Sequence, residues 1–227
     1  MRGLVAVLLA LAVLGGVTGA YRHPGAPEPT APLSFGLNRV AVIGDSYTTG
    51  GDEGGTGANG WTAIAWQILA REGVPTTTDV AAERGAGYAA RGEQGRIFQD
   101  LARGALRPDD TVVVFFGSRN DEHADPLLYP VMVYSTFQLA RRMAPNARFL
   151  VIGPPWPTAD PPGAVLRIRD ALEYQAGLAD ATFVDPIAAG WFVGRPDLIG
   201  QDGIHPTDSG HAYLADQIAP LIGAQLP

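Results

Sequence analysis

The chain contains no cysteine, which excludes disulfide bonds, a thiolate zinc site and a lipid anchor on cysteine. This absence leaves the compartment open, because exported proteins need not contain cysteine. Basic residues are also few: 16 Lys and Arg stand against 23 Asp and Glu, which gives a net charge of -7 and a pI near 5.0. A nucleic-acid partner requires a clustered basic surface, so the composition argues against nucleic-acid binding.

The N-terminus has the pattern of a secretory signal peptide. Arg2 is followed by an uncharged run, residues 3–20, that is rich in Leu, Val and Ala and ends in small residues. This pattern predicts a signal peptide over residues 1–20, cleaved after Ala20, and a secreted or cell-envelope location. The alternative is an N-terminal membrane anchor, because the run is only slightly shorter than a membrane span.

A proline-rich segment separates this leader from the rest of the chain. Residues 21–35 combine prolines with Gly, Ala and Thr, a composition that predicts a disordered tether. The remaining residues, 36–227, are enough for one folded domain with a sizeable core.

The folded part alternates strand and helix signals. Strands are predicted at 40–43, 76–82, 111–116, 149–152 and 182–184, and helices at 61–72, 94–103, 127–143, 161–178 and 209–221. Strands separated by helices imply a three-layer α/β/α sandwich around a central, mostly parallel, five-stranded sheet. The loop at 50–60 contains six glycines and is predicted to be too flexible for regular structure.

Ser46 follows the first predicted strand. The run Val40–Ile43 is apolar and mostly β-branched, as in a strand buried on both faces, and it leads into Gly44-Asp45-Ser46. Ligands of open α/β sheets bind at the carboxyl ends of the strands, which is where a nucleophilic serine would act. The alternative is a serine that only caps the structure after it.

A glycine-rich stretch follows the second strand. Gly85-Ala86-Gly87-Tyr88-Ala89-Ala90 formally matches a dinucleotide-binding fingerprint. That fingerprint needs a helix to begin at once, whereas Gly92 and Gly95 interrupt one here, so no nucleotide cofactor is expected. A turn that allows close backbone approach to a small group is favoured instead.

Asn120 follows the strongest strand signal, 111–116, in the sequence Gly117-Ser118-Arg119-Asn120-Asp121. Its side-chain amide can donate a hydrogen bond into the same crevice as Ser46, because both residues follow the carboxyl ends of parallel strands. It can equally be a turn residue that bonds its own backbone.

Asp202 and His205 lie three residues apart on a loop before the last helix, in Asp202-Gly203-Ile204-His205-Pro206. In nucleophilic catalysis a histidine takes the hydroxyl proton while a carboxylate holds its other ring nitrogen. The alternative is that both are ordinary loop residues. No metal site is expected, because the other histidines, at 23, 123 and 211, do not form a ligand pair of zinc-site spacing.

Together these segments resemble the four blocks of the SGNH (GDSL) hydrolase family, in order, over residues 40–221. The resemblance implies that Ser46 is the nucleophile, His205 the general base and then acid, and Asp202 the residue that orients His205. It implies an oxyanion hole from the N–H of Ser46, a glycine N–H and the Asn120 side chain. Gly87 is chosen as that glycine from its spacing to the next helix, with Gly85 as the alternative.

One position departs from the family pattern. The family usually has Gly-x-Asn-Asp in its third block, and Ser118 stands here in the place of that glycine. The extra side chain is expected to narrow the crevice but to leave Asn120 in place.

The resemblance implies an exported serine esterase that hydrolyses carboxylic esters without a cofactor or metal. Acylated or acetylated glycans and lipids are the expected substrates, with transient association with the membrane or cell envelope; the oligomeric state stays open. An acyltransferase would use the same residues, and only acceptor assays distinguish it. A non-catalytic glycan-binding domain on the same fold is the alternative from another class, and a missing triad residue would favour it.

Overall fold

The computed structural model describes residues 38–227. The predicted signal peptide at 1–20 and the tether at 21–35 therefore lie outside the described residues. Within residues 38–227, no helix is both long enough and apolar enough to span a bilayer.

The core of the domain is a five-stranded, wholly parallel sheet in the order β2-β1-β3-β4-β5. The strands are β1 Asn38–Gly44, β2 Thr76–Ala82, β3 Val112–Phe116, β4 Arg148–Ile152 and β5 Thr182–Val184. Every residue of β3 is buried, which explains its uninterrupted apolar sequence. The strand order reverses between β1 and β3, and a crevice for ligands opens at the carboxyl ends of the strands at such a point.

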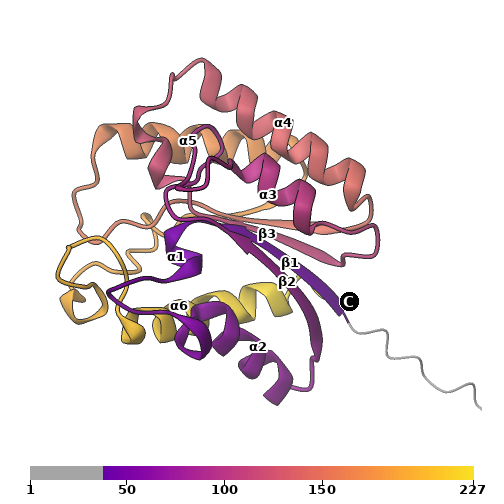
Figure 1. Cartoon of the computed structure of the whole chain (residues 1–227), viewed down its shortest axis with the longest axis horizontal. Helices are drawn as coiled ribbons and strands as arrows, with labels where there is room; N and C mark the ends of the chain where they lie inside the picture. Colours follow the sequence, from indigo (N-terminus) through magenta and orange to yellow (C-terminus); the bar gives the residue numbers. More distant parts are fainter. Residues whose placement is uncertain (1–37) are drawn as a thin grey trace, which may run out of the picture. The chain divides into compact units, whose positions relative to one another are not determined.

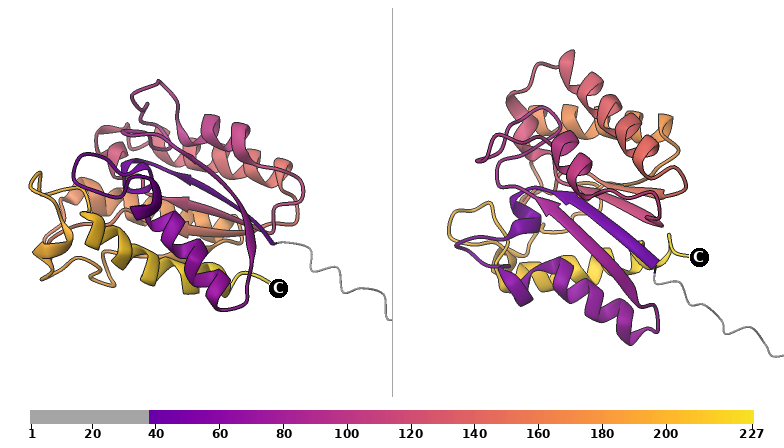
Figure 2. Two further views of the ribbon diagram at one scale, coloured as in Figure 1. Left: turned by 60° about the horizontal axis from the view of Figure 1, so that its bottom comes forward. Right: turned by 45° about the vertical axis from the view of Figure 1, so that its right-hand side comes forward.

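Helices cover both faces of the sheet (Figures 1 and 2). One layer consists of α3 Phe98–Ala105, α4 Leu128–Met143 and α5 Gly163–Leu178, and the other of α2 Trp61–Arg71 and α6 Asp208–Gly223. The short helix α1, Ser46–Thr49, lies at the end of the sheet to which the loop before α6 also comes (Figure 1). The predicted three-layer architecture is confirmed.

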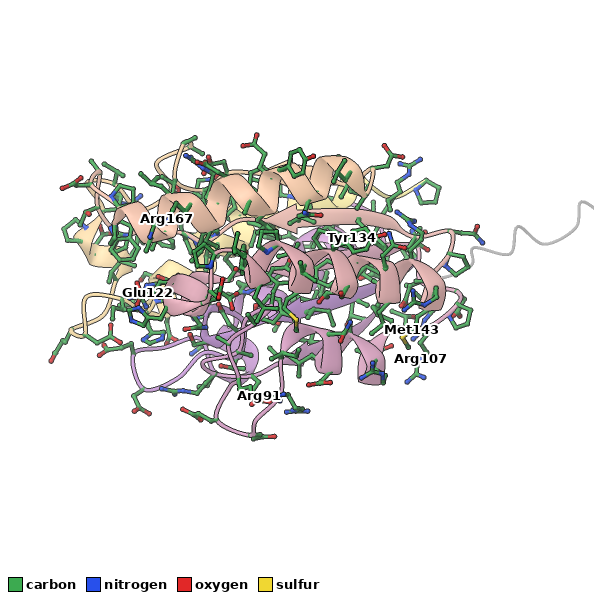
Figure 3. The ribbon with its side chains drawn as sticks, turned by 90° about the horizontal axis from the view of Figure 1, so that it is seen from above. Arg91, Arg107, Glu122, Tyr134, Met143 and Arg167 are labelled. Carbon is green, nitrogen blue, oxygen red and sulfur yellow. The ribbon has the colours of Figure 1, made fainter. Side chains whose placement is uncertain are left out.

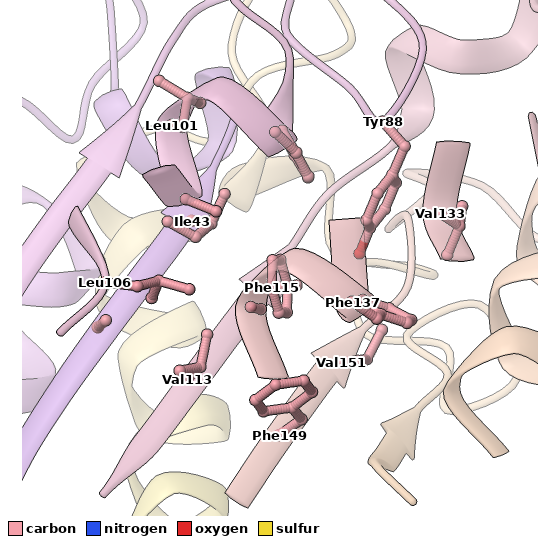
Figure 4. Close-up of a cluster of buried hydrophobic side chains, with 14 of the residues drawn as sticks. Ile43, Tyr88, Leu101, Leu106, Val113, Phe115, Val133, Phe137, Phe149 and Val151 are labelled. Atoms are coloured by element: carbon pink, nitrogen blue, oxygen red, sulfur yellow. The ribbon is translucent and has the colours of Figure 1, made fainter. Parts of the chain in front are cut away.

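Two apolar clusters hold the layers together, one on each face of the sheet. In β3, Phe115 packs with Tyr88, Phe137 and Phe149 under α3–α5 (Figure 4), whereas Phe116 faces the α2–α6 layer. Successive strand side chains point to opposite faces, so one strand supplies both clusters. The carboxyl end of β3 is thereby fixed on both sides.

The helix predicted at 94–103 begins later, at Phe98. The carboxylate of Glu83 accepts the backbone N–H of Gln94 at 2.6 Å and pairs with Arg96 Nε at 2.5 Å. These bonds hold residues 94–96 in a turn. The predicted start was therefore wrong, because a buried carboxylate from the end of β2 competes for the backbone.

The loop at 50–60 also differs from its prediction. It contains a one-turn 3₁₀ helix, Gly57–Asn59, and a β-bridge between Gly51 and Gly54. The carboxylate of Asp208, at the start of α6, accepts the backbone N–H of Gly55 and the side-chain amide of Asn59. The glycines serve close packing in a structured loop.

Candidate active site

The functional residues expected from the sequence lie at the carboxyl end of the sheet. Figure 3 looks down on the α3–α5 layer and places Glu122, which follows β3, at the end opposite Arg107 and Met143. The segment Arg119–His123 forms the 3₁₀ helix η2 directly after the β3 turn. Residues after β1, β2 and β3 therefore meet at one edge.

Ser46 is the first residue of α1, and the turn that leads into this helix requires a small residue at position 44. A Cβ added at Gly44 would lie 2.2 Å from Thr48 Oγ1, so the strand must end in glycine. Asp45 caps the helix, because its Oδ1 accepts the N–H of Tyr47 at 2.9 Å. Within residues 38–227 no hydrogen bond uses the Ser46 N–H, which leaves it available to a ligand.

The structure brings Ser46, His205 and Asp202 into one chain of hydrogen bonds. His205 Nε2 lies 3.0 Å from Ser46 Oγ, and His205 Nδ1 lies 2.5 Å from Asp202 Oδ2. Burial alone would raise the pKa of Asp202, but hydrogen bonds from His205 and Ile204 hold it below its ordinary value. Asp202 is therefore a carboxylate at neutral pH and can stabilise a protonated His205.

The same carboxylate shapes the loop that carries the histidine. Asp202 Oδ1 accepts the N–H groups of Ile204 at 2.8 Å and His205 at 2.9 Å. The three-residue spacing thus lets one side chain form the turn and orient the imidazole. Tyr47 holds this loop at a second point, since its hydroxyl donates to the Ile204 carbonyl. No motif in the sequence indicated this role of Tyr47.

Asp45 joins the β1 turn to the β3 turn. It is 1 % exposed, and its Oδ2 lies 3.4 Å from both the Ser118 N–H nitrogen and Asn120 Nδ2. Burial raises the pKa of Asp45 to about 6, although the N–H groups of Tyr47 and Ser118 oppose this shift. A Cβ at Gly117 would lie 2.3 Å from Asp45 Oδ2, so the approach requires glycine there.

Asn120 lies beside the 85–90 loop, which contains Gly85 and Gly87, the two glycines considered for the oxyanion hole. Asn120 Nδ2 donates to the Ala86 carbonyl at 2.8 Å, which anchors its amide beside the 85–90 loop. The Gly87 N–H donates to Ala90 O at 2.9 Å and is therefore occupied. In the described part of the chain no hydrogen bond uses the Gly85 N–H, and Gly85 adopts a positive φ of 76°.

Asp121 explains why glycine is needed at position 87. Its carboxylate accepts the N–H groups of Tyr88, Ala89 and Ala90 at 2.7–2.8 Å. A Cβ at Gly87 would lie 2.4 Å from Asp121 Oδ2. The small group that the glycine-rich turn approaches is thus the Asp121 carboxylate, which holds this loop against η2.

Ser118 has the left-handed backbone conformation that the glycine usual in the family would favour. Its φ is 94°, in the left-handed region, and it is fully buried. Its Oγ donates to Asp121 Oδ2 at 2.9 Å and lies 2.6 Å from the Tyr129 hydroxyl. These hydrogen bonds offset a backbone cost on the order of 1–3 kcal/mol. The serine side chain therefore supports Asp121 from inside the core.

Metal binding finds no support at this edge. Among residues 38–227, no three His, Asp or Glu side chains are grouped so as to hold a metal ion. His211 is buried, its Nδ1 accepts the Trp61 N–H at 3.3 Å, and burial lowers its pKa to about 4. His211 is thus a neutral packing residue between α6 and α2.

A hydroxyl, an imidazole and a carboxylate joined in this order, at the switch point of a parallel sheet, are the arrangement used by serine hydrolases. Comparison with known proteins gives the family. Residues 42–213 match the model of the GDSL-like lipase/acylhydrolase family. The chain belongs to this family of hydrolases that act on ester bonds, and the predicted resemblance is confirmed.

Individual relatives agree with this assignment. A protein of Mycobacterium tuberculosis described as GDSL lipase Rv0518 is 58% identical over 209 residues, which are 90% of each chain. The solved structure of TesA matches with a TM-score of 0.67 at 21% identity, over 83% of this chain and 100% of its own. A family two carbohydrate esterase of Clostridium thermocellum matches with a TM-score of 0.65 at 17% identity, over 83% and 64%. The last two likenesses concern the fold.

Proposed function

We propose that this chain is an exported serine esterase that hydrolyses carboxylic esters through an acyl-enzyme on Ser46. The observation that carries the proposal is the pair of contacts from His205, with Nε2 3.0 Å from Ser46 Oγ and Nδ1 2.5 Å from Asp202 Oδ2. The side chains of His205 and Asp202 are 30% and 35% exposed, so substrate can reach the pair from solvent.

In the first half-reaction, Ser46 Oγ attacks the ester carbonyl carbon while His205 Nε2 takes the hydroxyl proton. The tetrahedral intermediate collapses, the bond to the alcohol oxygen breaks, and His205 returns the proton to the leaving alcohol. Water then attacks the acyl-enzyme in the same manner, with His205 as base and Ser46 Oγ as leaving group. Asp202 remains a carboxylate and stabilises the imidazolium at each step.

Three donors are proposed for the developing oxyanion. They are the N–H of Ser46, the N–H of Gly85 and the amide of Asn120. Gly85 replaces Gly87 in this proposal, because the Gly87 N–H is held in a backbone turn by Ala90 O. The Asn120 amide also has a partner, the Ala86 carbonyl, but it lies on a side chain that can exchange this partner for the substrate oxygen. Fixed donors of this kind each contribute about 3 kcal/mol to the stabilisation of the transition state.

Lipid or glycan esters are the substrate class we propose. A relative named as a lipase at 58% identity supports lipid esters, and a structural neighbour named as a carbohydrate esterase supports glycan esters. A series of p-nitrophenyl esters of increasing acyl length tests both, with an acetate optimum favouring acetylated glycans and a long-chain optimum favouring lipids. If the folded protein hydrolyses none of these esters, the proposal is contradicted.

Export is supported by residues 1–20, with their single basic residue and apolar run. N-terminal sequencing of secreted protein should give a start at or near Tyr21. An intact Met1 on membrane-bound protein would instead identify an anchor.

Asn120→Ala should lower kcat about a hundredfold or more and leave KM nearly unchanged, because its donor bond strengthens only as charge develops on the substrate oxygen. The measurement is kcat per active site titrated with a serine-directed phosphonate, together with a thermal melt. The thermal melt is needed because the substitution also removes the hydrogen bond from Asn120 to the Ala86 carbonyl, which can lower the stability of the fold. Full activity per titrated site with a lowered melting temperature would make Asn120 a scaffold residue only.

A further inference from the structure

The loop 50–60 and the loop that carries Asp202 and His205 bind each other reciprocally. Asp208, at the start of α6, accepts the Gly55 N–H at 2.8 Å and Asn59 Nδ2 at 2.9 Å. In the other direction, a carboxylate from the 50–60 loop binds the backbone next to the active site. These contacts join segments about 150 residues apart in sequence.

Glu53 is the residue that binds in this second direction. Its Oε2 accepts the Gln201 N–H at 2.9 Å, and its Oε1 lies 3.3 Å from the Asp202 nitrogen. One carboxylate thus spans two consecutive N–H groups, and the second belongs to the residue that orients His205. Hydrogen bonds that backbone N–H groups donate to a carboxylate are among the stronger ones in proteins.

The neighbouring glycines show that this approach is close. A Cβ added at Gly200 would lie 2.2 Å from Glu53 Oε2, and one added at Gly54 would lie 2.4 Å from the Asp208 nitrogen. Each loop therefore has a glycine where the other loop approaches it most closely. Such contacts limit how far the backbone of Asp202 can move.

We infer that Glu53 is a positioning residue for the proposed esterase reaction: it fixes the backbone of Asp202, and through Asp202 it fixes the His205 ring against Ser46. This inference rests on the proposed function. Asp202 meets His205 within a three-residue turn, so any displacement of its backbone changes the contact of both ring nitrogens. Misplacement of catalytic groups by about 1 Å can cost up to about a hundredfold in rate.

The test compares Glu53→Ala, Glu53→Gln and Asp52→Ala. Asp52 is the matched control, because it is an exposed acidic neighbour. Glu53→Ala should lower kcat about tenfold with little change in KM, since Glu53 acts on the catalytic groups through the backbone of Gln201 and Asp202. Glu53→Gln keeps an amide oxygen that accepts one of the two N–H groups, and should lower kcat by about two- to threefold. Asp52→Ala should match wild type.

The pH profile separates positioning from a loss of folded protein. In Glu53→Ala the less fixed Asp202 stabilises protonated His205 less, so the acidic limb of kcat/KM should move to lower pH. The other ionisable groups that act on or face His205 are Asp45, Tyr47 and His211. These groups are unchanged in the variants. Glu53→Gln removes the same negative charge as Glu53→Ala but keeps an acceptor for the backbone, so the difference between the acidic limbs of the two variants reports on the position of Asp202.

Two results would overturn the inference: a wild-type kcat and pH profile in Glu53→Ala, or an equal loss in Asp52→Ala. If Glu53→Ala does not fold, Glu53→Gln takes its place, and an unshifted acidic limb with unreduced kcat per titrated site contradicts the inference. Ser46→Ala is assayed in parallel. An active Ser46→Ala would overturn the proposed function, whereas an inactive one beside a normal Glu53→Ala overturns the role of Glu53 alone.

Discussion

Ser46→Ala should lower kcat/KM for a p-nitrophenyl ester by about five powers of ten or more. Without Oγ no acyl-enzyme forms, and only the oxyanion donors acting on a water molecule remain. Within residues 38–227, His205 is the only hydrogen-bond partner of Ser46 Oγ, so the substitution should change the free energy of unfolding by about 1 kcal/mol at most.

The measurement is initial rate at saturating and limiting substrate, with a thermal melt for each preparation. Thr49→Ala is a suitable control, because in the described part of the chain its Oγ1 donates only to the carbonyl of the adjacent Gly50. It should keep activity within about threefold of wild type, since no catalytic contact is lost. A Ser46→Ala preparation that retains about a tenth of the wild-type rate would exclude Ser46 as the nucleophile.

Asp202→Asn should lower kcat at neutral pH by about 10³- to 10⁴-fold. The asparagine carbonyl can still accept the N–H groups of Ile204 and His205, so the turn survives. Its amide, however, donates toward His205 Nδ1 and places the ring proton on Nε2, where it faces Ser46. That tautomer cannot take the hydroxyl proton.

A stability measurement accompanies this prediction. The pKa of Asp202 in the folded protein lies below its ordinary value of 3.8, so its ionisation stabilises the fold above that pH. This contribution is lost as pH falls through the lower, folded-state pKa. Wild type and Asp202→Asn should therefore become closer in unfolding free energy in acid.

The activity prediction for Asp202→Asn has its own contradicting outcome. If the kcat of this variant lies within about tenfold of wild type, His205 does not depend on Asp202.

Most of the fold follows from local sequence. β-branched runs bounded by glycine or proline predict the strands, and the carboxyl ends of parallel strands bring Ser46 and Asn120 to one edge. The pair Asp202 and His205 is recognisable because both lie within one short motif. In these places the chemistry depends on residues that are close in sequence or on a periodic pattern.

The parts that could not be predicted depend on contacts between distant residues. The start of the helix expected at 94 is one example, because Glu83 holds that segment in a turn and the helix begins at Phe98. The choice between Gly87 and Gly85 rested on the spacing to this helix and stays a prediction. In the same way, no spacing reveals that Glu53 binds the Asp202 backbone or that Tyr47 binds Ile204. A single sequence does not encode such pairs as a pattern.

Covalent labelling tests the central claim most directly. The full-length protein is incubated with a serine-directed phosphonate, and the modified peptide is identified by mass spectrometry, for wild type and for His205→Ala. The account predicts one adduct per chain on Ser46, formed in step with loss of esterase activity, and labelling slowed by several powers of ten in His205→Ala. An adduct on another residue, or loss of activity without modification of Ser46, would contradict it.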